Sequence, residues 1–256
     1  MRHDLYYDLY TKEQDYWWHV GKRAIVYGLL DRFGRKGKAA GRRALDLGCG
    51  TGLNLDHLSK LAQPVGTDYY EEALQFCRER GHTMLCKADA AELPFGEGVF
   101  DIITALDVVE HLDDDVTALC ELRRVLRPGG VAVISVPAYP VLWTYWDDIL
   151  GHRRRYTTRT LRAAVEKAGL EVLKVSYSNT LTLFPATGVR ILKVLLHRAS
   201  ETRREPRVPE SDFVPIPEWL NRALIAYYRL EAWALRRVNL PFGLSVVCVA
   251  RRKRGT

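Results

Sequence analysis

A glycine-rich turn constrains the fold of this chain more than any other part of the sequence. The apolar run 44–47 leads into the turn Gly48-Cys49-Gly50-Thr51-Gly52, and leucines then recur at helical spacing over 53–61. A strand, a glycine turn and a helix form the first βα unit of a nucleotide-binding sheet, whose ligand lies at the carboxyl end of the strand. Glycine is needed in such a turn because it adopts positive φ and lets a ligand approach the backbone.

Carboxylates near the ends of the first two strands restrict the choice of ligand. Asp68 ends the short run 65–68, where an acidic side chain can accept hydrogen bonds from both hydroxyls of a ribose. The dinucleotide fingerprint G-x-G-x-x-G is not matched, because Gly52 comes one position early and Leu53 stands where the third glycine belongs. Asp46 would repel a phosphate but could hold an ammonium group. The pattern therefore favours a nucleoside with a cationic amino-acid tail.

The spacing Asp46-x-Gly48-x-Gly50-x-Gly52, followed by Asp68, closely resembles that of the class I S-adenosylmethionine-dependent methyltransferases. The resemblance implies an α/β fold with a Rossmann-like, seven-stranded, mostly parallel sheet, in which strand seven is antiparallel and helices cover both faces. It also implies S-adenosyl-L-methionine as the cofactor and S-adenosyl-L-homocysteine as the product. The cofactor-binding residues that it implies are Arg23, Asp46, Gly48, Cys49, Gly50, Asp68, Tyr69, Asp89, Ala90, Leu106, Asp107 and His111.

Two of these residues follow the expected third strand, 83–88. In the resembled family an acidic residue at the place of Asp89 hydrogen-bonds the adenine amino group, and the next backbone amide, here that of Ala90, meets a ring nitrogen. The alternative is that Asp89 only caps the following turn.

We expect three regions along the chain. Residues 1–41 are aromatic and helical, and they form either a lid over the cofactor, with Arg23 reaching its carboxylate, or a helix packed on the sheet edge. The methyltransferase core comprises 42–178 together with 243–256. Between the expected strands 172–178 and 243–249 lies a helical insertion, 179–242, which is too long for a hairpin loop. Its helices are expected near 189–196 and over 218–238.

The segment after the fifth strand supplies candidate catalytic residues. Asp148, His152 and Tyr156 are expected on one loop beside the transferring methyl group, in an Asp…His-x-Arg-Arg-Tyr pattern that is similar to a bacterial, type 11-like subgroup of methyltransferases. His111 and His152 are the candidate bases, since the unperturbed pKa of histidine lies near neutral pH. The alternative is that these side chains pack or hydrogen-bond within the structure.

The cofactor implies the mechanism. A sulfonium methyl group is already activated, so the enzyme mainly aligns a nucleophile in line with the C–S bond, and a base is needed only when the nucleophile carries a proton. Two other functions stay open: a protein that binds the cofactor without transferring its methyl group, as an adaptor, and a nicotinamide-dependent oxidoreductase. The first is disfavoured by the intact cofactor motif together with the His and Asp groups of the loop, and the second by Asp46 and Leu53.

Charge and composition indicate the partners. Residues 179–256 hold 14 Lys and Arg against 6 Asp and Glu, or +8, while the other residues hold 24 against 25, or −1. We expect the basic, aromatic insertion to meet a small-molecule or lipid-like acceptor or a membrane surface, unless it forms a homodimer contact or caps the sheet. Nucleic acid is disfavoured, because 107–110 lacks the Pro-Pro motif of base-modifying relatives. Five cysteines without paired spacing indicate reduced thiols, no metal site and a cytoplasmic location, peripheral to the inner membrane face at most.

Overall fold

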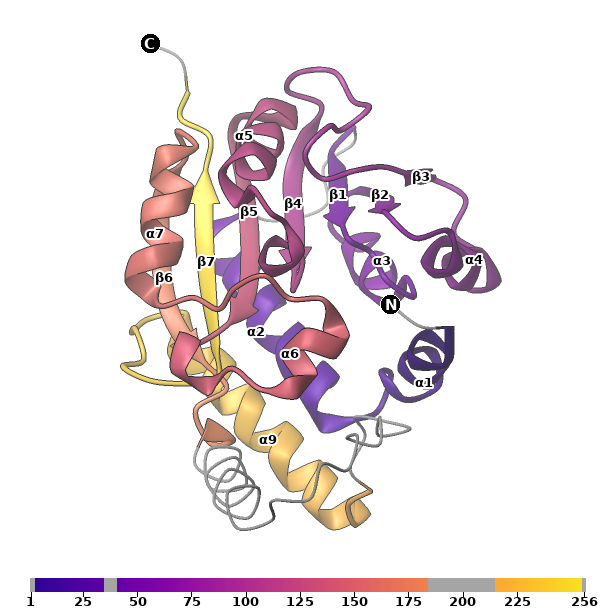
Figure 1. Cartoon of the computed structure of the whole chain (residues 1–256), viewed down its shortest axis with the longest axis vertical. Coiled ribbons are helices and arrows are strands. Elements are labelled where there is room, and N and C mark those ends of the chain that lie inside the picture. The colour runs from indigo at the N-terminus through magenta and orange to yellow at the C-terminus, as the bar shows by residue number, and fades with distance from the viewer. Residues whose placement is uncertain (1–2, 35–40, 184–214, 255–256) are drawn as a thin grey trace, which may run out of the picture.

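The computed structural model describes residues 3–34, 41–183 and 215–254, and its centre is a seven-stranded sheet (Figure 1). The strand order is β3-β2-β1-β4-β5-β7-β6. Neighbouring strands from β3 to β5 pair in parallel, whereas β7 is antiparallel to both β5 and β6. The expected seven-stranded, mostly parallel sheet with an antiparallel seventh strand is therefore confirmed. The strands are β1 (Arg43–Leu47), β2 (Gln63–Asp68), β3 (Leu85–Lys87), β4 (Phe100–Leu106), β5 (Leu126–Pro137), β6 (Glu171–Ser178) and β7 (Ser245–Arg251).

Helices cover both faces of the sheet, because successive side chains of each buried strand point to opposite sides. Ile134 and Val136 of β5 join the core under α5 and α7, while Val131 and Val133 join the core under α2 and α9. The helices are α1 (His3–Lys12), α2 (Trp17–Phe33), α3 (Leu53–Leu58), α4 (Glu71–Glu79), α5 (Asp115–Val125), α6 (Tyr145–Leu150), α7 (Thr158–Lys167) and α9 (Glu218–Leu235), with short 3₁₀ turns η1 (Val109–His111) and η2 (Pro140–Leu142).

Side-chain caps fix the ends of the helices that follow β4 and β5. The Asp114 carboxylate accepts the amide of Thr117 at 3.0 Å and starts α5. The Thr157 hydroxyl accepts the amide of Thr160 at 3.2 Å and starts α7. Gly169, with φ of +80°, follows the end of α7, as glycine commonly does after a helix.

Two boundaries differ from what the sequence suggests. Residues 127–130 are Arg-Pro-Gly-Gly, a composition typical of a turn before a strand at 131–136, but β5 already begins at Leu126. The structure shows one reason: the Gly129 amide donates to the carbonyl of Arg252 at 2.7 Å, so the chain beyond β7 extends the pairing. The helix expected over 218–238 ends at Leu235, and the helix expected near 189–196 lies outside the described residues.

The helix α9 from the expected insertion packs beside α2 on one face of the sheet (Figure 1). Tyr228 is fully buried there, and its ring stacks on that of Trp17 with centroids 5.7 Å apart. The buried Glu231 carboxylate accepts the amides of Asn179 at 2.6 Å and Thr180 at 3.1 Å, which ties α9 to the end of β6. Among the described residues, no helix combines the length and apolar character that a membrane span requires.

Candidate active site

The turn between β1 and α3, residues 48–52, is hereafter called the glycine loop, and its three glycines lie in the left-handed region that favours glycine. Gly48, Gly50 and Gly52 have φ of +68°, +54° and +87°. A Cβ atom on Gly48 would lie 2.4 Å from Cγ2 of Val108, so a side chain there would clash. On Gly50 it would meet nothing nearer than Cδ2 of Leu9, 4.0 Å away. The loop therefore packs tightly at one end and leaves space above Gly50, which fits the approach of a ligand to the backbone.

Asp68 ends β2 and faces this space. Its Oδ2 accepts the amide of Gly50 and its Oδ1 accepts the amide of Tyr70, both at 3.0 Å. Burial raises the pKa of Asp68, and the hydrogen bonds from the amides of Tyr70 and Gly50 oppose that shift. Each carboxylate oxygen can accept a second hydrogen bond, so the arrangement fits recognition of ribose hydroxyls.

Asp46 lies deeper, beneath the glycine loop. Its buried Oδ1 accepts the Thr104 hydroxyl at 2.7 Å and the side-chain amide of Asn54 at 2.8 Å. Burial raises the pKa of Asp46 to about 7, although both hydrogen bonds oppose the rise. Asp46 thus connects β1, α3 and β4, and its contact with a cofactor ammonium group stays a prediction.

The other sequence-predicted cofactor residues occupy varied surroundings. Asp89 is exposed and accepts the amide of Ala91 at 2.8 Å, so the capping contact that we gave as the alternative is present. Asp107 has φ of +56° and contacts the ammonium group of Lys22. Of the remaining predicted residues, Cys49 and Ala90 are buried, Leu106 is half-buried and Tyr69 is exposed.

The N-terminal helices are attached to the glycine loop by residues that the sequence did not single out. The Arg80 guanidinium donates to the carbonyls of Thr51 at 2.8 Å and Tyr10 at 3.0 Å, and it pairs with the Glu13 carboxylate at 2.8 Å. Glu13 also contacts the Thr51 hydroxyl. Arg23 donates to the backbone carbonyl of Glu13 at 2.8 Å. The segment that joins α1 to α2 therefore lies against the loop, and the lid stays a prediction.

A second polar group lies beyond the end of β4. Glu110 and His111 come from η1, and His152 comes from the segment after α6. The rings of His111 and His152 meet edge to face with centroids 4.7 Å apart. Burial raises the pKa of Glu110 to about 8 and lowers the pKa of His111 to about 4. The structure thus brings both candidate bases together, beside a carboxylate that the sequence analysis did not select.

The aspartate that orients His152 is Asp147, which the sequence analysis also did not select. Asp147 is fully buried, and its Oδ1 lies 2.8 Å from Nδ1 of His152 and 2.7 Å from Nε of Arg155. Burial alone would raise the pKa of Asp147, but hydrogen bonds from His152 and Arg155 hold it well below its usual range. The expectation that Asp148, His152 and Tyr156 share one loop is wrong, because Asp148 lies on α6. Its exposed carboxylate accepts the indole N–H of Trp143 at 3.1 Å.

Tyr156 is buried, and its hydroxyl donates to the Asp115 carboxylate at 2.7 Å. This bond connects the chain after α6 to the first residue of α5. A part in catalysis for Tyr156 and for Asp148 stays a prediction.

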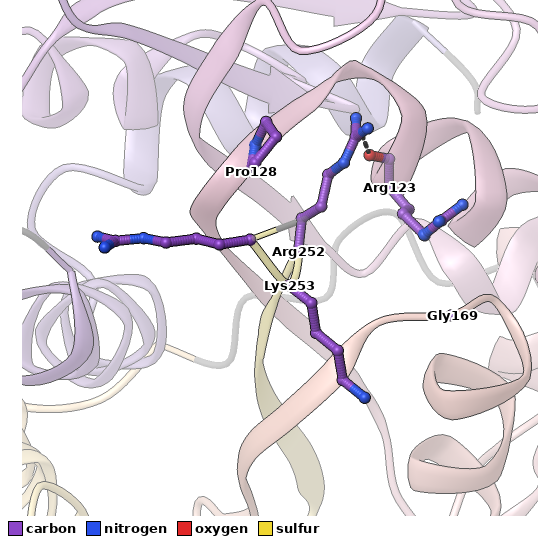
Figure 2. Close-up of a pocket in the computed structure, with 6 residues that line it drawn as sticks. Arg123, Pro128, Gly169, Arg252 and Lys253 are labelled. Carbon is purple, nitrogen blue, oxygen red and sulfur yellow. Dashed lines mark hydrogen bonds between the residues drawn. The ribbon is translucent and has the colours of Figure 1, made fainter. Parts of the chain in front are cut away.

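A cavity of about 290 Å³ lies at the opposite edge of the sheet, where β5 begins and β7 ends (Figure 2). Figure 2 shows the Arg252 guanidinium directed at the carbonyl of Arg123, which accepts it at 3.3 Å. Because the glycine loop follows the carboxyl end of β1, this cavity is not part of the candidate active site. Its lining residues are Arg123, Pro128, Gly169, Arg252, Lys253 and Arg254.

Comparisons with known proteins agree with this geometry. Residues 45–134, which include the glycine loop, Asp68 and His111, match the family model described as a methyltransferase domain. A probable S-adenosylmethionine-dependent methyltransferase of Mycolicibacterium smegmatis is 32% identical over 69% of this chain and 66% of its own length. Demethylmenaquinone methyltransferase of Staphylococcus aureus is 37% identical over 41% of this chain and 47% of its own length. The chain thus spans about two thirds or less of these curated relatives.

Solved structures share the fold at low sequence identity. A SAM-dependent methyltransferase from Archaeoglobus fulgidus has a TM-score of 0.52 at 21% identity and covers 91% of this chain and 92% of its own. The [4+2]-cyclase SpnF has a TM-score of 0.57 at 19% identity and covers 92% and 81%. The family model, the curated relatives and the glycine loop with Asp68 at the sheet edge lead to one assignment. The chain belongs to the class I S-adenosylmethionine-dependent methyltransferases.

Proposed function

We propose that this protein transfers the methyl group of S-adenosyl-L-methionine to a small-molecule or lipid-like acceptor by direct in-line displacement. The observation that supports the proposal is the bond between the Asp68 carboxylate and the Gly50 amide, beside the space above the glycine loop, where Asp68 would accept the ribose hydroxyls. The histidines follow the neighbouring strand β4 at the same edge of the sheet. The residues proposed to bind the cofactor and those proposed to act on the acceptor therefore lie at the same edge of the sheet.

Different residues of the chain would bind the cofactor and act on the acceptor. The glycine loop and Asp68 would hold the nucleoside, with Asp46 below them and α1 covering them. When bound, the cofactor supplies a methyl group on a positively charged sulfur. His111 or His152 would take the proton of a hydroxyl or ammonium acceptor, and Asp147 would fix the tautomer and direction of the His152 ring. Their position beside the acceptor would supply the orientation that such a displacement needs.

Two observations support a small-molecule or lipid-like acceptor. A relative at 37% identity is named a demethylmenaquinone methyltransferase. The described surface of α9 also exposes Trp219 by 71%, Leu230 by 61% and Trp233 by 54%, and the Arg237 guanidinium lies 4.4 Å from the centre of the Trp233 ring. Aromatic and basic side chains together are typical of a surface that meets an anionic membrane, although a homodimer would bury the same side chains.

The main alternative is a protein that binds the cofactor and transfers no methyl group. One structural neighbour is named a [4+2]-cyclase, and a shared fold does not define the reaction. A nicotinamide oxidoreductase is less well supported, because the Asp46 carboxylate lies beneath the loop where such enzymes bind a pyrophosphate.

Mass spectrometry with a methyl-labelled cofactor tests the proposal. The purified protein is incubated with the labelled cofactor and an extract of small molecules and lipids, and the extract is searched for labelled compounds. We expect one labelled class that needs the protein, and a large loss of labelling with His152→Ala while cofactor affinity stays within a few-fold. Cofactor binding without any labelled compound would favour the adaptor instead.

A further inference from the structure

The carboxyl group of Glu110 lacks the hydrogen bonds that a buried acid normally makes. Its side chain is completely buried, and neither carboxylate oxygen has a hydrogen-bond partner among the described residues. The nearby ammonium group of Lys22 contacts Asp107 instead. A buried carboxylate normally needs a hydrogen-bond donor or a cation, because desolvation of the charge is costly. An ionised Glu110 would therefore need a positively charged partner at this position.

Two imidazole rings lie beside this carboxylate. One ligand atom from each of Glu110, His111 and His152 lies within 4.8 Å of the others. Donor atoms around a tetrahedral zinc ion are about 3.3 Å apart, since each is about 2.0–2.1 Å from the metal. The ligand atoms would therefore have to approach one another by up to about 1.5 Å to hold the ion.

The ring of His152 is held from behind, as the rings of metal-binding histidines usually are. Nδ1 of His152 lies 2.8 Å from the Asp147 carboxylate, which leaves its Nε2 with a free lone pair when Nδ1 carries the proton. The Asp147 carboxylate is in turn fixed by Arg155, with Nε and Oδ1 2.7 Å apart.

We propose that Glu110, His111 and His152 form a binding site for one divalent transition-metal ion, with Zn²⁺ as the ion that fits best. One carboxylate and two imidazoles are the protein ligands of many catalytic zinc sites, and they leave a position open. Near the site, Lys22 pairs with Asp107 and Arg155 pairs with Asp147, so Glu110 is the carboxyl group there without a paired cation among the described residues.

The open position suggests what the ion would do. A metal-bound hydroxyl of an acceptor loses its proton more readily, with the proton leaving to solvent, and the resulting oxygen anion is a better methyl acceptor. This role rests on the proposed function, whereas metal binding does not. The proposal departs from the sequence analysis, which expected no metal site from the spacing of the cysteines. His152 is 41 residues from His111 along the chain, so no local motif indicates the group.

Metal titration of the purified full chain tests the site. The protein is stripped with a chelator and dialysed, Zn²⁺ binding is followed by calorimetry, and bound metal is counted after gel filtration. We expect one zinc ion per chain. Glu110→Gln and His152→Ala should each weaken binding at least tenfold, because each removes one of three ligands. Asp113→Asn, which removes a carboxylate that is 85% exposed in the same segment, should change it less than twofold.

Substitution with Co²⁺ tests the site in the wild-type protein, so this test does not depend on whether the variants fold. The wild-type protein with one equivalent of Co²⁺ should show visible absorption bands of a four- or five-coordinate ion with nitrogen ligands. Absence of these bands, less than stoichiometric zinc, or unchanged zinc affinity in both folded variants would overturn the proposal.

Titration of S-adenosyl-L-methionine into the metal-free protein separates this proposal from the proposed function. Cofactor binding without zinc binding removes the metal site and leaves the methyltransferase. Zinc binding without cofactor binding supports the metal site and contradicts the proposed methyltransferase function.

Discussion

His152 and Asp147 form a buried pair in which Nδ1 of the imidazole lies 2.8 Å from Oδ1 of the carboxylate. The same carboxylate accepts two N–H groups of Arg155, at 2.7 Å and 3.0 Å, and the amide of Thr144 at 2.7 Å. Asp147 therefore joins the start of α6 to the segment that follows it, and it fixes the ring that faces His111.

Asp147→Asn should lower the free energy of unfolding by about 3–5 kcal/mol, because it leaves the Arg155 guanidinium buried without its countercharge. Asp148→Asn is the matched control at the next position. Its carboxylate is exposed, so the change should stay within about 0.5 kcal/mol. Urea denaturation of the three proteins measures both values. Equal stability of the two variants would show that the Asp147 pair does not hold α6 in place.

The stability of the cofactor-free protein should fall as pH rises from 5 to 7, in part because of Asp46. Burial raises the pKa of Asp46 to about 7 in the folded chain. The unfolded state releases this proton near pH 4, so between the two pKa values the folded state binds more protons and loses stability as pH rises. Asp46→Asn lacks this effect.

Urea denaturation at pH 5 and pH 7 gives the comparison for Asp46. Wild type should lose on the order of 2 kcal/mol more than Asp46→Asn between these values. Identical losses in both proteins would mean that Asp46 titrates at its ordinary pKa.

The exposed face of α9 should bind anionic membranes. Flotation with anionic vesicles should recover the protein at low salt and much less at high salt, since each basic residue near the surface contributes about 1 kcal/mol that salt screens. Replacing both Trp219 and Trp233 by serine should weaken binding. Val141→Ser, which removes an apolar side chain 88% exposed on η2, is the control. A protein that never floats at low salt would contradict the membrane contact and favour a dissolved acceptor.

The sequence predicted the fold, and it selected the glycine loop and Asp68 as candidates, because both depend on short stretches of chain. The glycine loop and Asp68 lie within 21 residues, and their spacing alone implies the geometry. The choice between Asp147 and Asp148 could not be made in this way, since two adjacent aspartates are equivalent until the orientation of α6 is known. The pair Glu13 and Arg80 spans 67 residues and leaves no local pattern.

The burial of Glu110 could not be predicted from the sequence either. Glu110 stands next to His111 in a segment that also contains three consecutive aspartates, 113–115, and composition does not indicate which of these acids is buried. The structure shows that η1 packs under the segment after α6, where the Arg153 amide donates to the Glu110 carbonyl at 2.7 Å. This packing buries Glu110 and leaves Asp113 exposed.

Calorimetric titration of S-adenosyl-L-methionine into wild type, Asp68→Ala and Glu79→Ala tests the central claim most directly. Asp68 would accept hydrogen bonds from the ribose hydroxyls, and bonds to a charged group contribute about 1.5–3 kcal/mol each, so Asp68→Ala should weaken binding at least about tenfold. Glu79 is an exposed carboxylate on α4, and its removal should leave affinity within twofold. Unchanged affinity in Asp68→Ala, or no binding to wild type, would contradict the account.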